Sequence, residues 1–317
     1  MDTTLTLISP AKLNLFLHIN GKRPPGTAFA GYHELQTIFQ MLDRGDILHF
    51  KLSKNKGISI LPKLADIPDE DNLIFKAANA LIAHQKSNPS FPGIEIKLEK
   101  NLPMGGGLGG GSSNAATTLL ALNHLWQLGL DINDLADIGA QLGADVPIFV
   151  RGQSAWAEGI GDKITPIALP EHWYLILVPN CHINTGEIFS HQRLTRDTPK
   201  MKIAPALEGQ LNKQNTNDKI AYQDQPDSDF LGEKYRNDCE ALVSDLYPEI
   251  RHAIDWLSQY TRSRMTGTGA CCFGRFNSEQ EAQQVLNEAS TKFKGFIAKG
   301  VNLSPAIQRL NEANCSQ

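Results

Sequence analysis

Hydrophobic and polar residues alternate near the start of the chain. Aliphatic residues occupy the odd positions from Leu13 to Ile19, a period of two that is typical of a β-strand. Ser9 and Pro10 interrupt the pattern. Residues 5–20 are therefore expected to form two short strands, one before Ser9 and one after Pro10.

Lys12 and Asn14 lie on the second of these expected strands. Successive side chains of a strand point to opposite faces, so these two polar groups share the face opposite the leucines. From the residues alone, an exposed edge strand is the favoured explanation of this pattern. A functional pair of side chains is the alternative.

Later segments alternate irregularly between strand and helix patterns. Strand patterns occupy residues 35–42, 46–53, 57–62, 93–100, 172–179 and 296–301, with further strand-like pieces in 143–167 and 262–276. Helical patterns occupy residues 72–85, 115–126, 131–143, 237–260 with a break at Pro248, 278–293 and a short C-terminal stretch. Because strands and helices do not repeat as regular pairs, we expect an α+β fold rather than a doubly wound sheet.

The chain is expected to form two domains. The boundary is placed ahead of the apolar strand pattern at 172–179, which gives an N-terminal domain, 1–165, and a C-terminal domain, 166–317. Residues 195–236 are rich in Asn, Gln, Asp, Lys and Pro and contain only small apolar islands. This composition predicts a partly mobile excursion, to which the sequence assigns no function.

Composition favours a small-molecule partner. The 317 residues are 41% hydrophobic, as in soluble globular proteins, and a formal net charge of -4 argues against nucleic acid held by a basic field. No apolar run approaches the ~18 residues of a membrane span, and the N-terminus is acidic, so no membrane partner or export is expected. The cysteines follow no metal-ligand spacing, which predicts reduced thiols and a cytoplasmic location: Cys181, Cys239, Cys271, Cys272 and Cys315.

The most distinctive stretch is residues 103–116, PMGGGLGGGSSNAA, with six glycines between an expected strand and an expected helix. Glycine lets backbone N–H groups approach a bulky anion closely, and a helix N-terminus presents further N–H groups. Ser112, Ser113 and Asn114 are residues that cap helices. The pattern therefore predicts a phosphate cradle.

Three alternatives for this stretch fit less well. A nucleotide P-loop needs a lysine after the last glycine, where Ser112 stands. A dinucleotide fingerprint matches Gly105, Gly107 and Gly110, but the acidic residue ~20 positions on, Asp131, begins a helix rather than ending a strand. A mobile surface loop rarely places SSNAA before a good helix.

The whole string resembles the phosphate loop of the GHMP small-molecule kinases, which include galactose, homoserine, mevalonate and phosphomevalonate kinases. PAKLNLFLHI near the N-terminus and MTGTGACCFGRF near the C-terminus agree with that family in the same order. The segments GYHELQTIFQMLD, DNLIFKAA, LGADVPIFV and AWAEGIGD narrow the resemblance further. It implies a two-domain α+β GHMP kinase fold with the active site in the cleft between domains. It also implies ATP-dependent phosphorylation of the 2-hydroxyl of 4-diphosphocytidyl-2-C-methyl-D-erythritol, in the non-mevalonate isoprenoid pathway.

Catalytic roles follow from the resemblance. It makes Asp145 the proton acceptor for the substrate hydroxyl and Lys12 the cation that orients Asp145 and offsets charge on the moving phosphoryl group. Taken alone, Asp145 is equally explained as a residue of a turn that ends a helix.

Binding residues are implied in the same way. For ATP, with Mg²⁺, they are Pro103, Met104, Gly105, Gly106, Gly107, Leu108, Gly109, Gly110, Gly111, Ser112, Ser113, Asn114 and Asn72. For the acceptor they are Asn14, Tyr32, His33, Phe39 and Phe189, with aromatic rings on both sides of the cytosine and His33 reading its polar edge, and Thr266, Gly267, Thr268 and Gly269 closing the site. The structural alternatives are helix caps for Ser112 and Asn72, core packing for Phe39 and Phe189, and a β-turn for residues 266–269.

Two other functions stay open at this point. Another GHMP kinase would take galactose, homoserine or mevalonate, whereas Tyr32 and His33 suit an aromatic base. A non-catalytic nucleotide-binding module would not need both Lys12 and Asp145. Metal ligands and oligomeric state are not determined by the sequence.

Overall fold

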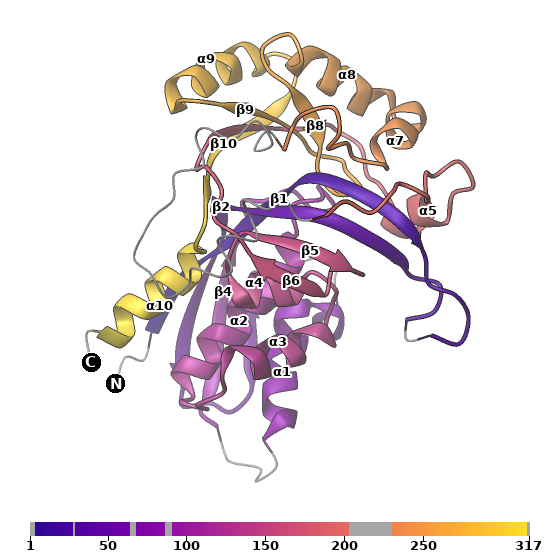
Figure 1. Ribbon diagram of the computed structural model, residues 1–317. Helices are drawn as coiled ribbons and strands as arrows, with labels where there is room; N and C mark the ends of the chain where they lie inside the picture. Colours follow the sequence, from indigo (N-terminus) through magenta and orange to yellow (C-terminus); the bar gives the residue numbers. More distant parts are fainter. Residues whose placement is uncertain (1–3, 28, 64–67, 86–90, 203–229, 316–317) are drawn as a thin grey trace, which may run out of the picture.

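Two long antiparallel strands, β1 (Thr4–Lys22) and β2 (His33–Ser53), run through the centre of the computed structural model (Figure 1). The structure describes residues 4–27, 29–63, 68–85, 91–202 and 230–315. The expectation of two short strands before residue 21 is wrong, as is the separation of 35–42 from 46–53. β-Bulges bend each strand without ending it.

One such irregularity lies where Ser9 and Pro10 of β1 pair with Asp46 and Gly45 of β2. The register between β1 and β2 shifts between Pro10 and Lys12. A Cβ on Gly45 would lie 1.8 Å from the carbonyl oxygen of Ser9, so only glycine allows this close approach. Pro10 therefore lies at an irregularity within a continuous strand rather than at the end of one.

The remaining strands complete a mixed sheet. Its ten strands follow the path β3-β4-β2-β10-β7-β9-β8, with β1, β5 and β6 paired off it, and only β3 and β4 among the named pairs run parallel. The bounds are β3 (Ile58–Leu61), β4 (Gly93–Glu99), β5 (Ala155–Gly159), β6 (Lys163–Pro166), β7 (Trp173–Val178), β8 (Ser263–Met265), β9 (Cys272–Phe276) and β10 (Lys294–Val301).

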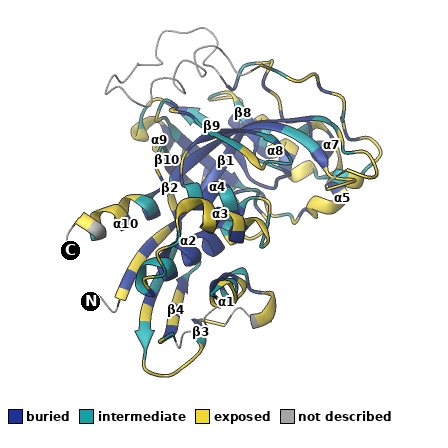
Figure 2. Cartoon of the chain, turned by 60° about the horizontal axis from the view of Figure 1, so that its bottom comes forward, coloured by how far each residue is buried: buried dark blue, intermediate teal, exposed yellow. Residues whose placement is uncertain are grey.

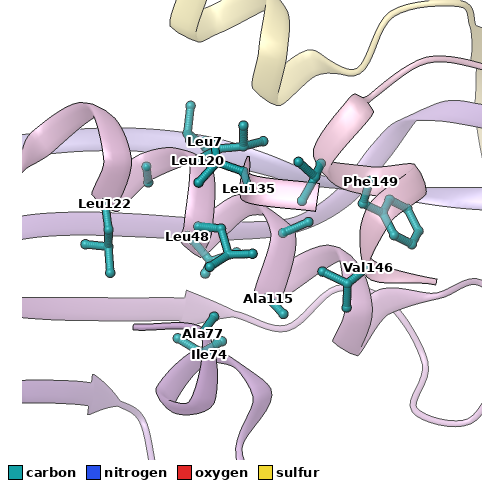
Figure 3. Close-up of a cluster of buried hydrophobic side chains, with 14 of the residues drawn as sticks. Leu7, Leu48, Ile74, Ala77, Ala115, Leu120, Leu122, Leu135, Val146 and Phe149 are labelled. Atoms are coloured by element: carbon teal, nitrogen blue, oxygen red, sulfur yellow. The ribbon is translucent and has the colours of Figure 1, made fainter. Parts of the chain in front are cut away.

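Helices of the first half pack together on β1, β2 and β4. They are α1 (Leu73–His84), α2 (Gly110–Leu125), α3 (Ile132–Ala140) and α4 (Val146–Arg151), preceded by a short 3₁₀ turn, Asp69–Asp71. Residues Ser113 to Leu122 of α2 are buried, as the dark ribbon of this helix shows (Figure 2). Figure 3 shows where these elements meet: Leu7, Leu48, Ile74, Ala77, Ala115, Leu120, Leu122, Leu135, Val146 and Phe149.

Local sequence signals explain several helix ends. The Asn72 side chain accepts a hydrogen bond from the Ile74 N–H, and Asp131 forms a capping box with Asp134, which confirms the expected starts of α1 and α3. The strand-like pattern expected after Gly143 is wrong at its beginning, because residues 146–151 form α4. Pro147 in its first turn and the left-handed Gly152 after it favour a short helix.

Three helices of the second half, α7 (Glu240–Leu246), α8 (Pro248–Leu257) and α9 (Glu279–Ala289), lie on the opposite side of β1 and β2 from α1–α4 (Figure 1). The short helix α5 (Thr185–Ser190) lies near one end of these two strands, and α10 (Pro305–Cys315) ends the chain on the side of α1–α4 (Figure 1). The expected break at Pro248 is confirmed. Leu310 of α10 belongs to the core cluster of α1–α4, and the boundary at 165/166 stays a prediction.

The flanks of the polar segment 195–236 pack on β1. Thr198 N–H donates to the Ile19 carbonyl, and Leu17 N–H donates to the Arg236 carbonyl. Residues 203–229, where mobility was expected, lie outside the described residues. None of the helices in the described ranges is long and apolar enough to cross a membrane.

Candidate active site

A cavity of about 970 Å³ opens between the glycine segment (residues 103–111), β1, β2 and α5. It brings together residues that are more than 250 positions apart in the sequence. The predicted site residues on its wall are Lys12, Asn14, Tyr32, His33, Phe39, Asn72, Pro103, Met104, Gly105, Gly106, Gly107, Leu108, Gly109, Gly110, Gly111, Ser112, Asn114, Asp145, Phe189, Gly267 and Thr268. Ser113, Thr266 and Gly269 are not on it.

Lys12 lies at the centre of the site and is only 4% exposed. Its Nζ donates to Asn14 Oδ1 at 2.5 Å and to the Gly107 carbonyl at 3.1 Å, and it lies 3.7 Å from Asp145 Oδ2. The same Nζ stands 5.3 Å from the centroid of the Phe39 ring. This burial and these contacts correct the favoured expectation of an exposed edge strand.

The protonation of Lys12 reflects two opposing effects. Burial, which disfavours the charged ammonium, is the larger one and lowers the pKa of Lys12 below its ordinary value, while the Asp145 carboxylate opposes the shift. Asp145 precedes α4, and its side chain makes no capping hydrogen bond and is 39% exposed. It is thus a carboxylate held beside a cation and open to the cavity.

Asn14 is held by hydrogen bonds to two residues that are distant in the sequence. Its Nδ2 donates to Thr37 Oγ1 at 2.9 Å, and its backbone N–H donates to Thr266 Oγ1 at 2.9 Å. Thr37 in turn donates to the Phe16 carbonyl. Asn14 therefore presents its Oδ1 to Lys12 in a fixed orientation.

The glycine segment ends at the N-terminus of α2. The first helical hydrogen bond runs from Ser113 N–H to the Gly109 carbonyl, so the N–H groups of residues 110–112 precede it. Gly107 and Gly109 both have φ of +74°. A Cβ on Gly107 would lie 2.3 Å from the Thr266 carbonyl oxygen, so this contact requires glycine.

Besides Asn72, which caps α1, two of the predicted ATP-binding side chains have structural partners. Ser113 is fully buried and its hydroxyl accepts from Ser9 Oγ at 2.8 Å, so the structure does not bring it to the cavity. Asn114 reaches the wall, but its Nδ2 donates to Asp46 Oδ2 at 3.0 Å. Ser112 also lines the cavity, so two of the three polar residues at the start of α2 reach it.

Asp46 was missed by the sequence analysis. It is fully buried, and its carboxylate accepts from Lys100 Nζ at 2.7 Å and from the Asn101 and Leu102 N–H groups at 2.8 Å, besides Asn114. These bonds connect β2, the end of β4 and α2 next to the glycine segment. A lone Asp in a strand pattern carries no local signal of this role.

Residues 266–269 approach the glycine segment from the second half of the chain. The Ala270 and Cys271 N–H groups donate to the Gly105 and Gly106 carbonyls. Thr266 is fully buried and holds Asn14, while Gly267 and Thr268 reach the cavity. The structure therefore makes Thr266 a support of the site, and Gly269 packs against Ile183 and Met265.

Aromatic residues gather at the other end of the cavity. His33 stacks on Phe189 of α5 with ring centroids 5.1 Å apart, and Tyr32 is 56% exposed beside them. Burial is the main effect that lowers the pKa of His33, and the charges of Arg196 and Lys22 add to it. The imidazole is therefore neutral near pH 7.

Comparisons with known proteins identify the family of this chain. Residues 72–153 match the model of the GHMP kinases N terminal domain, and residues 228–295 match GHMP kinases C terminal. A "4-diphosphocytidyl-2-C-methyl-D-erythritol kinase" of Marinobacter nauticus is 51% identical over 313 residues, 98% of this chain and 99% of its own. The Pseudomonas aeruginosa protein of that name is 47% identical over 98% of this chain and 99% of its own.

Solved structures show the same fold. A crystal structure of 4-(cytidine 5'-diphospho)-2C-methyl-D-erythritol kinase superposes with a TM-score of 0.74 at 26% identity, covering 94% of this chain and 100% of that one. The Methanococcus jannaschii mevalonate kinase superposes with a TM-score of 0.64 at 14% identity, covering 95% and 99%, and supports the fold alone. The expected fold is confirmed. On the sequence identity and the coverage together, this chain belongs to the GHMP family of small-molecule kinases and, within it, to the 4-diphosphocytidyl-2-C-methyl-D-erythritol kinases.

Proposed function

We propose that this protein transfers the γ-phosphoryl group of ATP to the 2-hydroxyl of 4-diphosphocytidyl-2-C-methyl-D-erythritol, giving the 2-phosphate and ADP, in the cytoplasm and within the non-mevalonate isoprenoid pathway. The observation that carries the proposal is the position of Lys12. One ammonium contacts the glycine segment through the Gly107 carbonyl and faces the Asp145 carboxylate. The names of the relatives support the choice of acceptor.

The glycine end of the cavity suits a nucleoside triphosphate. The N–H groups of residues 110–112 and the positive end of the α2 dipole attract phosphate oxygens. Asn72, Leu73 and Leu98 line the neighbouring wall, where an adenine and ribose have both apolar and polar contacts.

Asp145 and Lys12 perform the chemical step in this proposal. Phosphoryl transfer requires mainly positioning and charge stabilisation. Asp145 accepts the proton of the attacking hydroxyl as the O–P bond forms, and ADP leaves with the electrons of the broken bond. Lys12 holds Asp145 by attraction and offsets negative charge on the transferring group.

Magnesium would neutralise phosphate charge when bound with ATP. No cluster of three or more His, Cys, Asp or Glu side chains is placed to hold a metal within the described ranges. Mg²⁺ does not require one, since it commonly takes one or two carboxylates together with substrate phosphates and water. The Ser112 hydroxyl is an oxygen donor of the cavity wall that fits this role.

The aromatic end suits the cytidine of the acceptor. A base between Tyr32 and Phe189 would gain stacking on both faces, and His33 would bond its polar edge. Galactose, homoserine and mevalonate have no aromatic ring to stack between Tyr32 and Phe189.

The proposal is tested by ADP release with each acceptor in turn. Wild-type protein should be active with the cytidylyl compound, whereas Lys12→Ala and Asp145→Asn should each lose about 10²-fold or more in kcat. Exposed residues of neighbouring elements, changed as Lys97→Ala and Asp137→Asn, serve as matched controls and should stay near wild type. Activity with galactose, homoserine or mevalonate but not with the cytidylyl compound would contradict the proposal, as would full turnover in either site variant.

A further inference from the structure

Arg196 lies at the start of the polar segment to which the sequence analysis gave no function. Its Nε donates to His33 Nε2 at 3.0 Å. Its two terminal nitrogens donate to three backbone carbonyls, those of Phe189 at 2.8 Å, His191 at 2.7 Å and Leu194 at 3.1 Å. One guanidinium therefore joins the His33 ring to the C-terminal end of α5, which carries Phe189.

The contact with Arg196 determines where the His33 proton lies. A guanidinium has N–H donors and no acceptor, so the nitrogen that faces it must offer a lone pair. That nitrogen is Nε2. Because the imidazole is neutral, its single proton is then on Nδ1, the other polar atom of the ring.

The orientation of the His33 and Phe189 rings favours a hydrogen bond from His33 that lies in the plane of a bound base. His33 and Phe189 are tilted by 28° from parallel. A base that stacks on Phe189 beside the imidazole consequently lies close to the imidazole plane. The Nδ1–H group then meets the edge of the base rather than its face.

We propose that Arg196 is a positioning residue for base specificity: by holding His33 in the Nδ1-protonated form, it makes the site select a pyrimidine whose N3 is a hydrogen-bond acceptor, as in cytosine, over one whose N3 carries a proton, as in uracil. The inference rests on the proposed function and deepens it. With uracil, the His33 Nδ1–H group would face the N3–H donor of the base. Both N–H groups would then give up hydrogen bonds to water without gaining one to each other.

The first test observes the tautomer directly, without substrate. In ¹⁵N-histidine NMR of the free protein, His33 Nδ1 should show a protonated nitrogen and Nε2 an unprotonated one. The signal is assigned by its loss in His33→Asn. Arg196→Met should shift both nitrogens toward a mixture of tautomers, whereas Arg193→Met should not, because Arg193 is 58% exposed and bonds to Asp245. A proton on Nε2 in the wild-type protein would overturn the inference.

The second test compares kcat/KM for the cytidylyl acceptor and its uridylyl analogue. Wild-type protein should prefer the cytidylyl compound by about 10²-fold or more. Arg196→Met should lower that ratio by about tenfold, through the KM of the acceptor and not that of ATP. Arg196→Lys, which keeps a donor-only group, should retain more of the ratio, and Arg193→Met all of it.

The outcomes separate this inference from the function on which it rests. Wild-type activity with the cytidylyl acceptor and an unchanged ratio in a folded Arg196→Met variant overturn the role of Arg196 and leave the proposed function in place. No wild-type activity with that acceptor overturns both. If Arg196→Met does not fold, the wild-type tautomer and the Arg196→Lys ratio decide.

Discussion

Replacing Gly107 by alanine is expected to damage both stability and turnover, by two separable effects. The first is backbone strain, because φ at this position is +74° and a side chain in the left-handed region costs about 1–2 kcal/mol. The second is a collision, because the new Cβ would lie 2.3 Å from the Thr266 carbonyl oxygen and 3.0 Å from that of Gly269. Overpacking of this kind costs about 1–3 kcal/mol more.

The collision also moves the catalytic lysine. An ordinary van der Waals contact begins near 3.4 Å, so the glycine segment must move by about 1 Å to accept the new Cβ. The Gly107 carbonyl is a hydrogen-bond acceptor for Lys12 Nζ, which shifts with it. A displacement of this size at the reacting groups costs about 10²-fold in rate.

Gly129→Ala is the matched control. Gly129 has a similar φ of +68°, but a Cβ there would meet nothing within 4 Å. It should therefore lose about 1–2 kcal/mol from strain and keep normal turnover. Urea denaturation measures the free energy of unfolding, and ADP release at varied ATP measures kcat/KM. The reasoning is refuted if Gly107→Ala retains wild-type kcat/KM, or if the two variants lose equal stability.

Three further predictions concern charged groups. Turnover should fall as pH rises through the lowered pKa of Lys12, because the ammonium loses its proton and its positive charge there. Lys12→Arg should move this alkaline limb of the pH profile to higher pH, since a guanidinium stays charged. Burial is the main cause of the lowered pKa of His18, so the unfolded state takes up a proton before the folded state as pH falls below about 6.5. The free energy of unfolding should therefore drop in that pH window. Urea titrations at each pH should show a smaller drop for His18→Asn, and an equal drop would contradict the role of His18. Asp46→Asn should lose about 3–5 kcal/mol of unfolding free energy, because it leaves the ammonium of Lys100 without its buried carboxylate. Glu312→Gln, which breaks an exposed ion pair, should lose under about 1 kcal/mol. Similar losses in the two variants would contradict the role of Asp46.

Features that depend on adjacent residues could be predicted from the sequence. The starts of α1 at Asn72 and α3 at Asp131 depend on side chains that cap the next turn, and Pro248 separates α7 from α8 by its own ring. The glycine segment was predicted as a phosphate cradle for the same reason, because glycines before a helix N-terminus are a local signal.

Features that depend on distant partners could not be predicted in this way. The pattern around Lys12 favoured an exposed strand, because nothing near it in the sequence shows that β2, Gly107 and Asp145 enclose it. Residues 146–151 have strand-forming side chains, and packing of α4 against α2 and α3 adds to the local signals of Pro147 and Gly152 in making them helical.

By itself, the sequence determined which residue types are available for phosphate, proton and base, and the local geometry of the segments that carry them. Only the tertiary structure decided which of those groups reach a common cavity: it placed Ser113 and Thr266 in supporting roles, revealed Asp46 next to the glycine segment and brought Arg196 to His33. The physical reason is that a side chain's partner and burial depend on strand register and helix packing between segments far apart in the chain, which no local pattern encodes.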